Sequence, residues 1–257
     1  MEVNPFRGEG KTALVLSPGG MFGAYQAGVL QVLADRVQPD LIVGVSVGAL
    51  NGWTIAGGCT PTQLQEIWRD PETASILTMR DRKSLLRGGY FDPAPLLRKA
   101  EEIHRLFQPR MPYGLVVVRV PGFHTELIPG EHVIPLHLLA TCSIPLFFPT
   151  VRIGPARYTD GGTIQAMPLW AAAAMGATRI IAVNSLPRVF PLWLDLPMRS
   201  IRIVRPPKRL PPGIHVTTVT PSEKLGGAQE AVIWKRENVD RWIALGVRDA
   251  ARQIPLQ

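Results

Sequence analysis

The chain has 257 residues, of which 46% are hydrophobic and 19% charged, which excludes a disordered protein and is typical of a folded globular one. Its formal net charge of +8 suits anionic partners, either phospholipid surfaces or nucleic acid, and charge alone does not separate the two. The two cysteines, Cys59 and Cys142, lack metal-ligand or redox spacing. We therefore expect two buried free thiols, no metal and no other cofactor.

Two long stretches without Asp, Glu, Lys or Arg, residues 12–34 and 41–65, resemble membrane spans at first sight. The first is interrupted by Pro18-Gly19-Gly20 and the second contains five glycines. Buried strands, tight turns and buried helices fit both stretches better. No secretory leader is visible, so we expect a cytoplasmic protein that can lie peripherally at a membrane.

The first quarter of the chain predicts two strand–helix pairs. Residues 12–17 (TALVLS) form a short apolar run that ends at a Pro-Gly-Gly turn, and residues 23–36 carry apolar side chains at helical spacing. Residues 41–45 predict a second buried strand, which is followed by a helix of small residues over 47–56.

The rest of the chain continues this alternation. Residues 61–108 are more charged and mainly helical. The further predicted elements are strands over 115–120, 179–184 and 214–219, and helices over 134–141 and from about 228 to 253. Strands that alternate with helices imply an α/β fold with a mostly parallel sheet covered on both faces. No internal repeat or clean boundary is visible, so we expect one domain over residues 1–257.

Residues 186–213 interrupt the pattern. They contain seven prolines and six Lys or Arg against one acidic residue, Asp195, with Phe190 and Trp193 interleaved. This density of proline excludes a long helix or a central strand, so the segment is predicted to be a loop. Its cations could bind an anionic membrane while its aromatic side chains insert, or it could be a solvated loop.

A candidate nucleophile lies in Gly44-Val45-Ser46-Val47-Gly48, between the second predicted strand and its helix. A nucleophile elbow needs flanking glycines, here Gly44 and Gly48, because its backbone is strained and the strand and helix approach closely. Ser46 would lie at the helix N-terminus, whose partial positive charge favours developing negative charge. As a bare pattern G-x-S-x-G is weak, and a simple turn serine is the alternative.

The turn Pro18-Gly19-Gly20-Met21-Phe22-Gly23 also joins a strand to a helix, and it can leave backbone N–H groups free to face a ligand. It lacks the Gly-Lys-Ser/Thr ending of a Walker loop and the G-x-G-x-x-G of a dinucleotide site. The turns at residues 18–23 and 44–48, if they lie side by side, are best interpreted as an oxyanion hole next to a nucleophile. A third piece, Asp160-Gly161-Gly162, predicts only a turn when it is taken alone.

Together the three pieces resemble the signatures of patatin-like phospholipases, in that family's order. The segments that carry the resemblance are 17–30 (SPGGMFGAYQAGVL), 44–48 (GVSVG) and 160–162 (DGG). Residues 138–149 (LLATCSIPLFFP) resemble the family segment that precedes the Asp, and residues 242–251 (WIALGVRDAA) resemble its closing helix. The likeness covers nearly the whole chain and is weakest over 63–114 and 186–213.

The resemblance implies a three-layer α/β/α fold and a Ser–Asp dyad without a catalytic His. Asp160 would accept the proton of Ser46 as the serine attacks an acyl ester, and the N–H groups of Gly19, Gly20 and Met21 would hold the oxyanion. A lipid or other acyl ester would be the substrate. An ordinary Asp has a pKa near ~4 and is a poor base for a serine hydroxyl, so the oxyanion hole would have to supply much of the rate enhancement.

Three departures from the family pattern affect the expected specificity. Pro18 replaces the first glycine of a triplet and has no N–H to donate. Phe22 replaces a basic residue and makes the site more apolar, and Ala166 replaces a common Asn. Simple esters therefore remain open as substrates beside phospholipids.

Two other readings compete. In an α/β-hydrolase with a Ser–His–Asp triad, His215 would follow Asp160 in the right chain order. A non-enzymatic, basic membrane-binding protein would use residues 186–213. No nucleic-acid-binding module is recognisable, so we do not expect a nucleic-acid partner.

Overall fold

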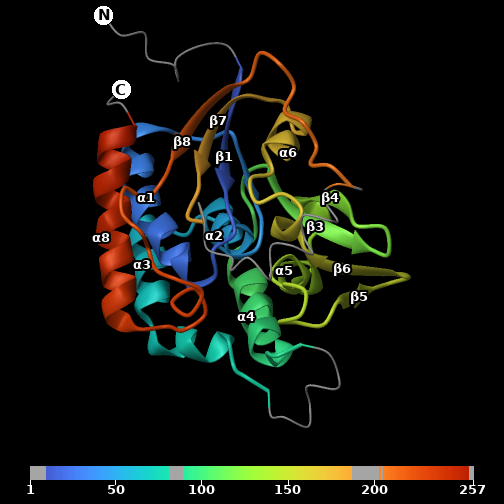
Figure 1. Ribbon diagram of the computed structural model, residues 1–257. Coiled ribbons are helices and arrows are strands. Elements are labelled where there is room, and N and C mark those ends of the chain that lie inside the picture. The colour runs from blue at the N-terminus through green and yellow to red at the C-terminus, as the bar shows by residue number, and fades with distance from the viewer. Residues whose placement is uncertain (1–9, 81–88, 187–202, 204, 255–257) are drawn as a thin grey trace, which may run out of the picture.

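The computed structural model describes residues 10–80, 89–186, 203 and 205–254. Its centre is an eight-stranded sheet with the order β5-β6-β3-β2-β1-β7-β8, and β4 pairs with β3 off this path (Figure 1). The strands are β1 (Lys11–Leu16), β2 (Leu41–Gly44), β3 (Tyr113–Val120), β4 (His124–Pro129), β5 (Val151–Ile153), β6 (Ala156–Asp160), β7 (Ala177–Val183) and β8 (His215–Val219).

The sheet is mostly parallel, as the alternation of strands and helices predicts. Strands β3, β2, β1, β7 and β8 pair in parallel, so their carboxyl ends share one edge. Strands β4, β5 and β6, which the sequence did not reveal, pair antiparallel. For the pairs β3–β4 and β5–β6 the connections explain this direction, because residues 121–123 and 154–155 are too short for the crossover that a parallel pair needs.

Helices cover both faces of the sheet. The first face carries α1 (Gly23–Arg36), α2 (Val47–Ala56), α3 (Pro61–Arg69), α4 (Pro93–Leu106), α5 (Pro135–Thr141) and α8 (Arg236–Gln253). The second face carries the short helix α6 (Leu169–Ala174), whose Trp170 packs against Ala13 and Val15 of β1. The alternate β1 residues Leu14 and Leu16 belong to the core of the first face. The predicted α/β fold with helices on both sides of a central sheet is therefore confirmed.

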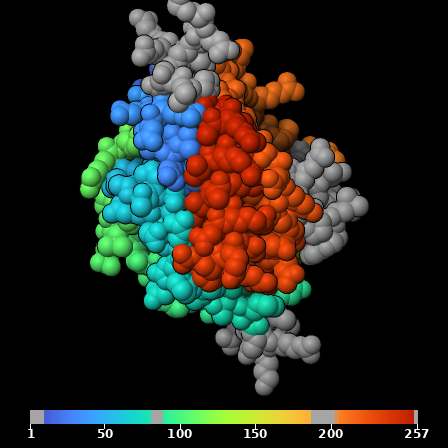
Figure 2. All heavy atoms as spheres, turned by 90° about the vertical axis from the view of Figure 1, so that its left-hand side faces the viewer, coloured from blue at the N-terminus to red at the C-terminus, as the bar shows by residue number. Residues whose placement is uncertain are grey.

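Helix α8 is the outermost element of the first face, where it runs lengthwise beside α1 and α3 (Figure 2). It begins at Arg236, whereas the sequence predicted a start near residue 228. Residues 228–234 instead form turns, in which the Ala231 carbonyl accepts the N–H of Met21 at 2.9 Å. Because the Ala231 carbonyl accepts from the Gly-rich turn, it is not used for a hydrogen bond within a helix.

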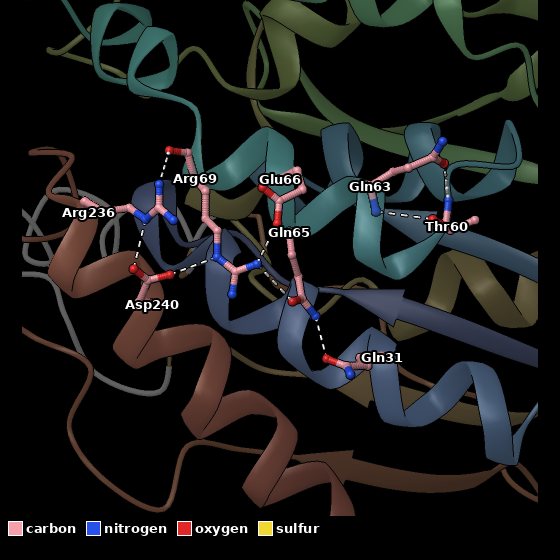
Figure 3. A network of polar contacts seen from close by, with 8 residues as sticks. All are labelled: Gln31, Thr60, Gln63, Gln65, Glu66, Arg69, Arg236 and Asp240. Atoms are coloured by element: carbon pink, nitrogen blue, oxygen red, sulfur yellow. Dashed lines mark hydrogen bonds and ion pairs between the residues drawn. The ribbon is translucent and has the colours of Figure 1, made fainter.

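A polar network fixes α3 against α8 and α1 (Figure 3). Asp240 of α8 accepts from Arg69 Nε at 2.8 Å and from Arg236 Nε at 2.9 Å, and Arg69 lowers the pKa of Asp240. Gln65 donates to Gln31 of α1 at 2.6 Å. Each exposed ion pair alone contributes little to the stability of the fold. Because Asp240 accepts from both Arg69 and Arg236, the two pairs together hold α3 against α8.

Only part of the predicted proline-rich loop can be described. Lys208 and Gln165 exchange two hydrogen bonds of 3.0 and 3.1 Å between backbone and side-chain amide, and Lys208 Nζ lies 3.7 Å above the Trp170 ring. These contacts hold the end of the loop against α6. Arg205 Nε donates to the Gly122 carbonyl at 3.0 Å, whereas the cations Arg188, Arg199 and Arg202 and the aromatic residues Phe190 and Trp193 lie outside the described residues.

Within the described residues, none of the helices combines the length and the apolar character needed to cross a membrane.

Candidate active site

Ser46 occupies a strained turn between β2 and α2. Its φ of 55° and ψ of −132° fall in a region that L-residues rarely adopt. Such strain persists only where the surrounding structure enforces it, and it is typical of a nucleophile elbow. The side chain is 4% exposed and lines a cavity.

The two glycines of the predicted elbow are required by close packing. A Cβ on Gly44 would lie 2.4 Å from the Gly48 carbonyl oxygen, and a Cβ on Gly48 would lie 2.5 Å from the carbonyl oxygens of Leu16 and Ser17. These are backbone atoms that cannot move aside. Helix α2 therefore starts directly against the carboxyl ends of β1 and β2, with Ser46 above them.

Asp160 ends β6 and is 1% exposed. Its Oδ1 accepts the Gly162 N–H at 2.6 Å, and Oδ2 is buried without a hydrogen-bond partner in the described structure. Burial raises the pKa of Asp160 to about 7, although the Ser46 hydroxyl and the Gly162 N–H both oppose this rise. Asp160 therefore departs from an ordinary Asp, and its buried carboxylate is a stronger base than an exposed one.

Ser46 and Asp160 are neighbours although they come from strands separated by β3. The Ser46 hydroxyl is close enough to favour the ionised form of Asp160, yet Oδ2 of the carboxylate has no completed hydrogen bond among the described residues. Loose contacts of this kind are common in free enzymes and tighten when substrate binds. The geometry is suited to proton transfer from the hydroxyl to the carboxylate.

The Gly-rich turn faces the same cavity but provides fewer free donors than predicted. The N–H groups of Gly19 and Gly20 have no acceptor in the part of the chain that the structure describes. The Met21 N–H, by contrast, donates to the Ala231 carbonyl at 2.9 Å. The prediction that the Met21 N–H faces the oxyanion is therefore corrected, because this group is already hydrogen-bonded to Ala231. Gly19 and Gly20 remain as the candidate oxyanion donors.

A buried polar network supports this turn from below. Gln26 of α1 donates to the Ser17 carbonyl at 2.7 Å and to Ser185 Oγ at 3.1 Å. Asn51 of α2 donates to Gln26 Oε1 at 2.9 Å and accepts from Trp68 Nε1 at 3.1 Å. The network links β1, α1, α2 and α3, so it fixes the turn relative to the elbow. No sequence motif indicated this network.

Cys142 lines the cavity and is close enough to Ser46 and Asp160 for both to affect its thiol. Burial raises the pKa of its thiol well above the usual range, and the charge of Asp160 raises it further. The thiol therefore stays neutral and does not compete with Ser46 as a nucleophile. Both cysteines are buried and free, as predicted.

The cavity has a volume of about 210 Å³ and a mainly apolar wall. One end contains Ser46, Asp160, Gly19 and Gly20, and the other runs between α2, α3 and α4. Its apolar lining includes Leu50, Leu64, Ile67, Leu96, Ile103 and Phe147. Such a shape suits an apolar chain attached to a carbonyl at the serine.

All five histidines are among the described residues, and none lines this cavity. His215 is exposed at the first residue of β8, where it is in register with Arg179 at the start of β7. The elbow follows the carboxyl end of β2, so His215 lies at the opposite edge of the parallel strands. A triad that includes His215 is excluded by this arrangement.

Comparisons with known sequences show which proteins this chain resembles. A family model described as patatin-like phospholipase matches residues 14–173, more than half of the chain. A curated relative, patatin-like phospholipase domain-containing protein 7 of Rattus norvegicus, is 29% identical over an alignment of 185 positions that covers 67% of this chain and 13% of that protein. The chain thus spans a small part of this relative.

Comparison with solved structures gives matches that cover most of this chain. VipD from Legionella pneumophila has a TM-score of 0.51 at 10% identity, covering 95% of this chain and 66% of that one. ExoU from Pseudomonas aeruginosa, solved in complex with SpcU, has a TM-score of 0.41 at 13% identity, covering 95% and 53%. The likeness to VipD supports the fold.

Proposed function

The chain belongs to the patatin-like phospholipase family, and from this we propose that it is a serine hydrolase that cleaves acyl esters of lipids through Ser46 and Asp160. The observation that carries the proposal is the strained Ser46 beside a buried Asp160 with a pKa of about 7, at one end of an apolar cavity. We take residues 1–257 as one such unit, with no histidine, metal or other cofactor in the reaction.

In the first half of the reaction Ser46 Oγ attacks the acyl carbonyl carbon while its proton passes to Asp160. The N–H groups of Gly19 and Gly20 hold the resulting oxyanion. The tetrahedral intermediate then collapses, and the alcohol leaves with the proton from Asp160. The raised pKa of Asp160 makes its carboxylate a better base than an exposed one, so less of the barrier falls on the oxyanion donors.

In the second half Asp160 removes a proton from water, which attacks the acyl-enzyme. Collapse of this second intermediate releases the carboxylic acid and returns the proton to Ser46. The same carboxylate thus acts as a base and then as an acid in each half. The apolar cavity would hold the acyl chain of a simple ester as well as that of a phospholipid. Phe22, expected from the sequence to make the site more apolar, is instead fully buried against the Trp242 ring and does not line the cavity.

We also propose that the protein contacts an anionic membrane peripherally, at the apolar rim formed by Met79, Tyr90 and Leu146. These side chains are 71%, 52% and 58% exposed, and Tyr90 N–H donates to the Leu146 carbonyl at 3.3 Å. Their neighbours Leu77, Phe91 and Phe147 line the cavity. An exposed apolar rim that continues into an apolar cavity would let an acyl chain enter from lipid, and the net charge of +8 would favour an anionic surface.

The test is a panel of short-chain esters, long-chain esters and phospholipids, assayed with the wild type, Ser46→Ala and Asp160→Asn. We expect both variants to lose at least about a hundred-fold in turnover. A serine-directed fluorophosphonate should label the wild type and not Ser46→Ala. Unchanged turnover in either variant would refute the mechanism, and an unlabelled, folded wild type would favour a non-catalytic lipid-binding protein.

A further inference from the structure

The side chain of Thr141 connects the elbow to the neighbouring strand. Its Oγ1 accepts the Ser46 N–H at 2.9 Å and donates to the Val116 carbonyl of β3 at 2.8 Å. Thr141 is completely buried, so no solvent can replace either bond. The hydroxyl therefore acts once as acceptor and once as donor, and its only hydrogen is committed to the Val116 carbonyl.

Ser46 needs such a partner because of its position. A residue that immediately precedes a helix has no intrahelical acceptor for its N–H. The same residue holds a φ of 55°, which its own side chain does not favour. The bond to Thr141 satisfies the buried N–H and restrains the peptide whose orientation sets the direction of the Ser46 side chain.

Ser143, two residues after Thr141, holds the backbone of Asp160 and the side chain of the preceding Thr159. The Ser143 carbonyl accepts the Asp160 N–H at 3.0 Å and the Thr159 hydroxyl at 2.5 Å. Thr141 and Ser143 are thus two residues apart and hold, respectively, the backbone of Ser46 and the backbone of Asp160. The end of α5 and the two residues that follow it therefore span the gap that β3 leaves between the two reacting groups.

From this juxtaposition we propose that Thr141 is a positioning residue, which holds Ser46 at the orientation needed for proton transfer to Asp160. It acts through the Ser46 backbone and does not touch the substrate. The proposal rests on the proposed role of Ser46 as nucleophile. It extends that role by assigning the restraint of the elbow to one hydroxyl group outside the three sequence signatures.

Three variants separate the hydroxyl from the bulk of the side chain. Thr141→Val keeps the volume and removes the hydroxyl, Thr141→Ser keeps the hydroxyl and removes the methyl group, and Thr141→Ala removes both. We expect Thr141→Val and Thr141→Ala to lower kcat by about 10- to 100-fold, the range that a small misplacement of a reacting group produces. KM for a short-chain ester should change less than threefold, and Thr141→Ser should retain at least about a third of the wild-type kcat.

The rate of labelling by a fluorophosphonate is measured in parallel, because it reports the attack by Ser46 without the rest of the cycle. It should fall with kcat in the Val and Ala variants and recover in Thr141→Ser. If Thr141 served only packing, the order would reverse, with Thr141→Val close to wild type and Thr141→Ser impaired. That order, or equal activity in all three variants, would overturn the proposal.

A matched control is Thr12→Val. Thr12 is also buried in the sheet region, at 3% exposure, and its hydroxyl accepts from Arg179 Nε at 3.1 Å, but it lies at the opposite end of β1 from the elbow. It should lose stability without losing kcat in the folded fraction. If Thr141→Val does not fold, Thr141→Ser still distinguishes the two roles of the side chain. A serine variant with low kcat indicates that the methyl group is needed for packing, and one with kcat near wild type indicates that the hydroxyl is sufficient. Activity in Ser46→Ala would instead refute the proposed function itself.

Discussion

The backbone N–H of Met21 donates a hydrogen bond of 2.9 Å to the carbonyl of Ala231, which joins the Gly-rich turn to the segment before α8. The contact brings a backbone oxygen against Gly20, where an added Cβ would lie 2.2 Å from it. Gly20 also has a φ of +56°, which favours glycine. Two independent constraints therefore act at this one position.

Gly20→Ala should consequently be far more damaging than Gly19→Ala. The alanine at 20 must displace backbone and adopt a left-handed conformation, so we expect kcat for a short-chain ester to fall at least about a hundred-fold, as for loss of an oxyanion donor. A Cβ at 19 would meet the Ser185 hydroxyl at 2.7 Å, and Gly19 has an extended φ of 170°. Rotation of the Ser185 side chain would relieve that contact at the cost of its hydrogen bond from Gln26, while the backbone stays in place. Equal kcat values for the two variants would contradict this account of the turn.

The rate should follow the ionisation of a single group near neutral pH. Asp160 has to be ionised to accept the proton of Ser46, and its pKa is raised to about 7 by burial. We expect kcat/KM to rise tenfold per pH unit below pH 7 and to level off above it. The measurement is a pH profile with a short-chain ester, and a plateau already reached at pH 5 would show that the base is an ordinary exposed carboxylate.

The same raised pKa has a consequence for stability. A folded-state pKa of about 7 against an ordinary 3.8 means that the folded protein binds the proton more tightly than the unfolded chain. The resulting stability is fully present below pH 4 and is lost as the pH rises through 7. With about 1.4 kcal/mol for each unit of a difference of about 3, the wild type loses on the order of 4 kcal/mol by pH 8.

Asp160→Asn removes this penalty because its side-chain oxygen can still accept the Gly162 N–H while the charge is gone. Its free energy of unfolding in urea should exceed that of the wild type at pH 8, and the difference should shrink towards pH 4. A variant that is less stable than the wild type at pH 8 would show that the ionised carboxylate is stabilised in the fold. The gain in stability with loss of activity is what a functional site under strain predicts.

Local patterns explain which parts of the fold were predictable. Helices α1 and α2 begin and end where the sequence indicates, because glycine-rich turns and apolar spacing mark their ends. The start of α8 was missed because residues 228–235 suit a helix locally, while Ala231 is bound to Met21, more than 200 residues away in sequence. The hairpin β5–β6 was missed because its strands are short.

The features of the site also divide into those that local motifs indicate and those that depend on tertiary contacts. Ser46 and Asp160 were recognisable from motifs, but the pKa of Asp160 depends on burial that no motif encodes. The occupied N–H of Met21 and the hydroxyl bridge of Thr141 exist only through tertiary contacts. Thr141 lies inside a segment that resembles the family, yet its bonds to Ser46 and Val116 could not be read from its neighbours in sequence.

The deep end of the cavity should determine acyl-chain length. Ile103 of α4 lines it and is 6% exposed. Ile103→Trp would fill the space between α2 and α4, so kcat/KM for long-chain esters should fall at least about tenfold while short-chain esters are hydrolysed as before. Leu106→Trp, one turn further along α4 and 53% exposed, is the control that should leave the ratio unchanged. An equal loss for both chain lengths in Ile103→Trp would indicate damage to the fold instead.

The rim of the cavity offers a test of membrane contact at Leu146, which is 58% exposed and has a φ of 72°. A bulky residue in this conformation is strained, and asparagine tolerates it better. Leu146→Asn should therefore keep or slightly raise the melting temperature while it weakens binding to anionic vesicles several-fold in a sedimentation assay. Leu106→Asn removes an equally exposed leucine from α4 and should bind vesicles like the wild type. Loss of binding in both variants, or in neither, would mean that lipid contacts another part of the surface.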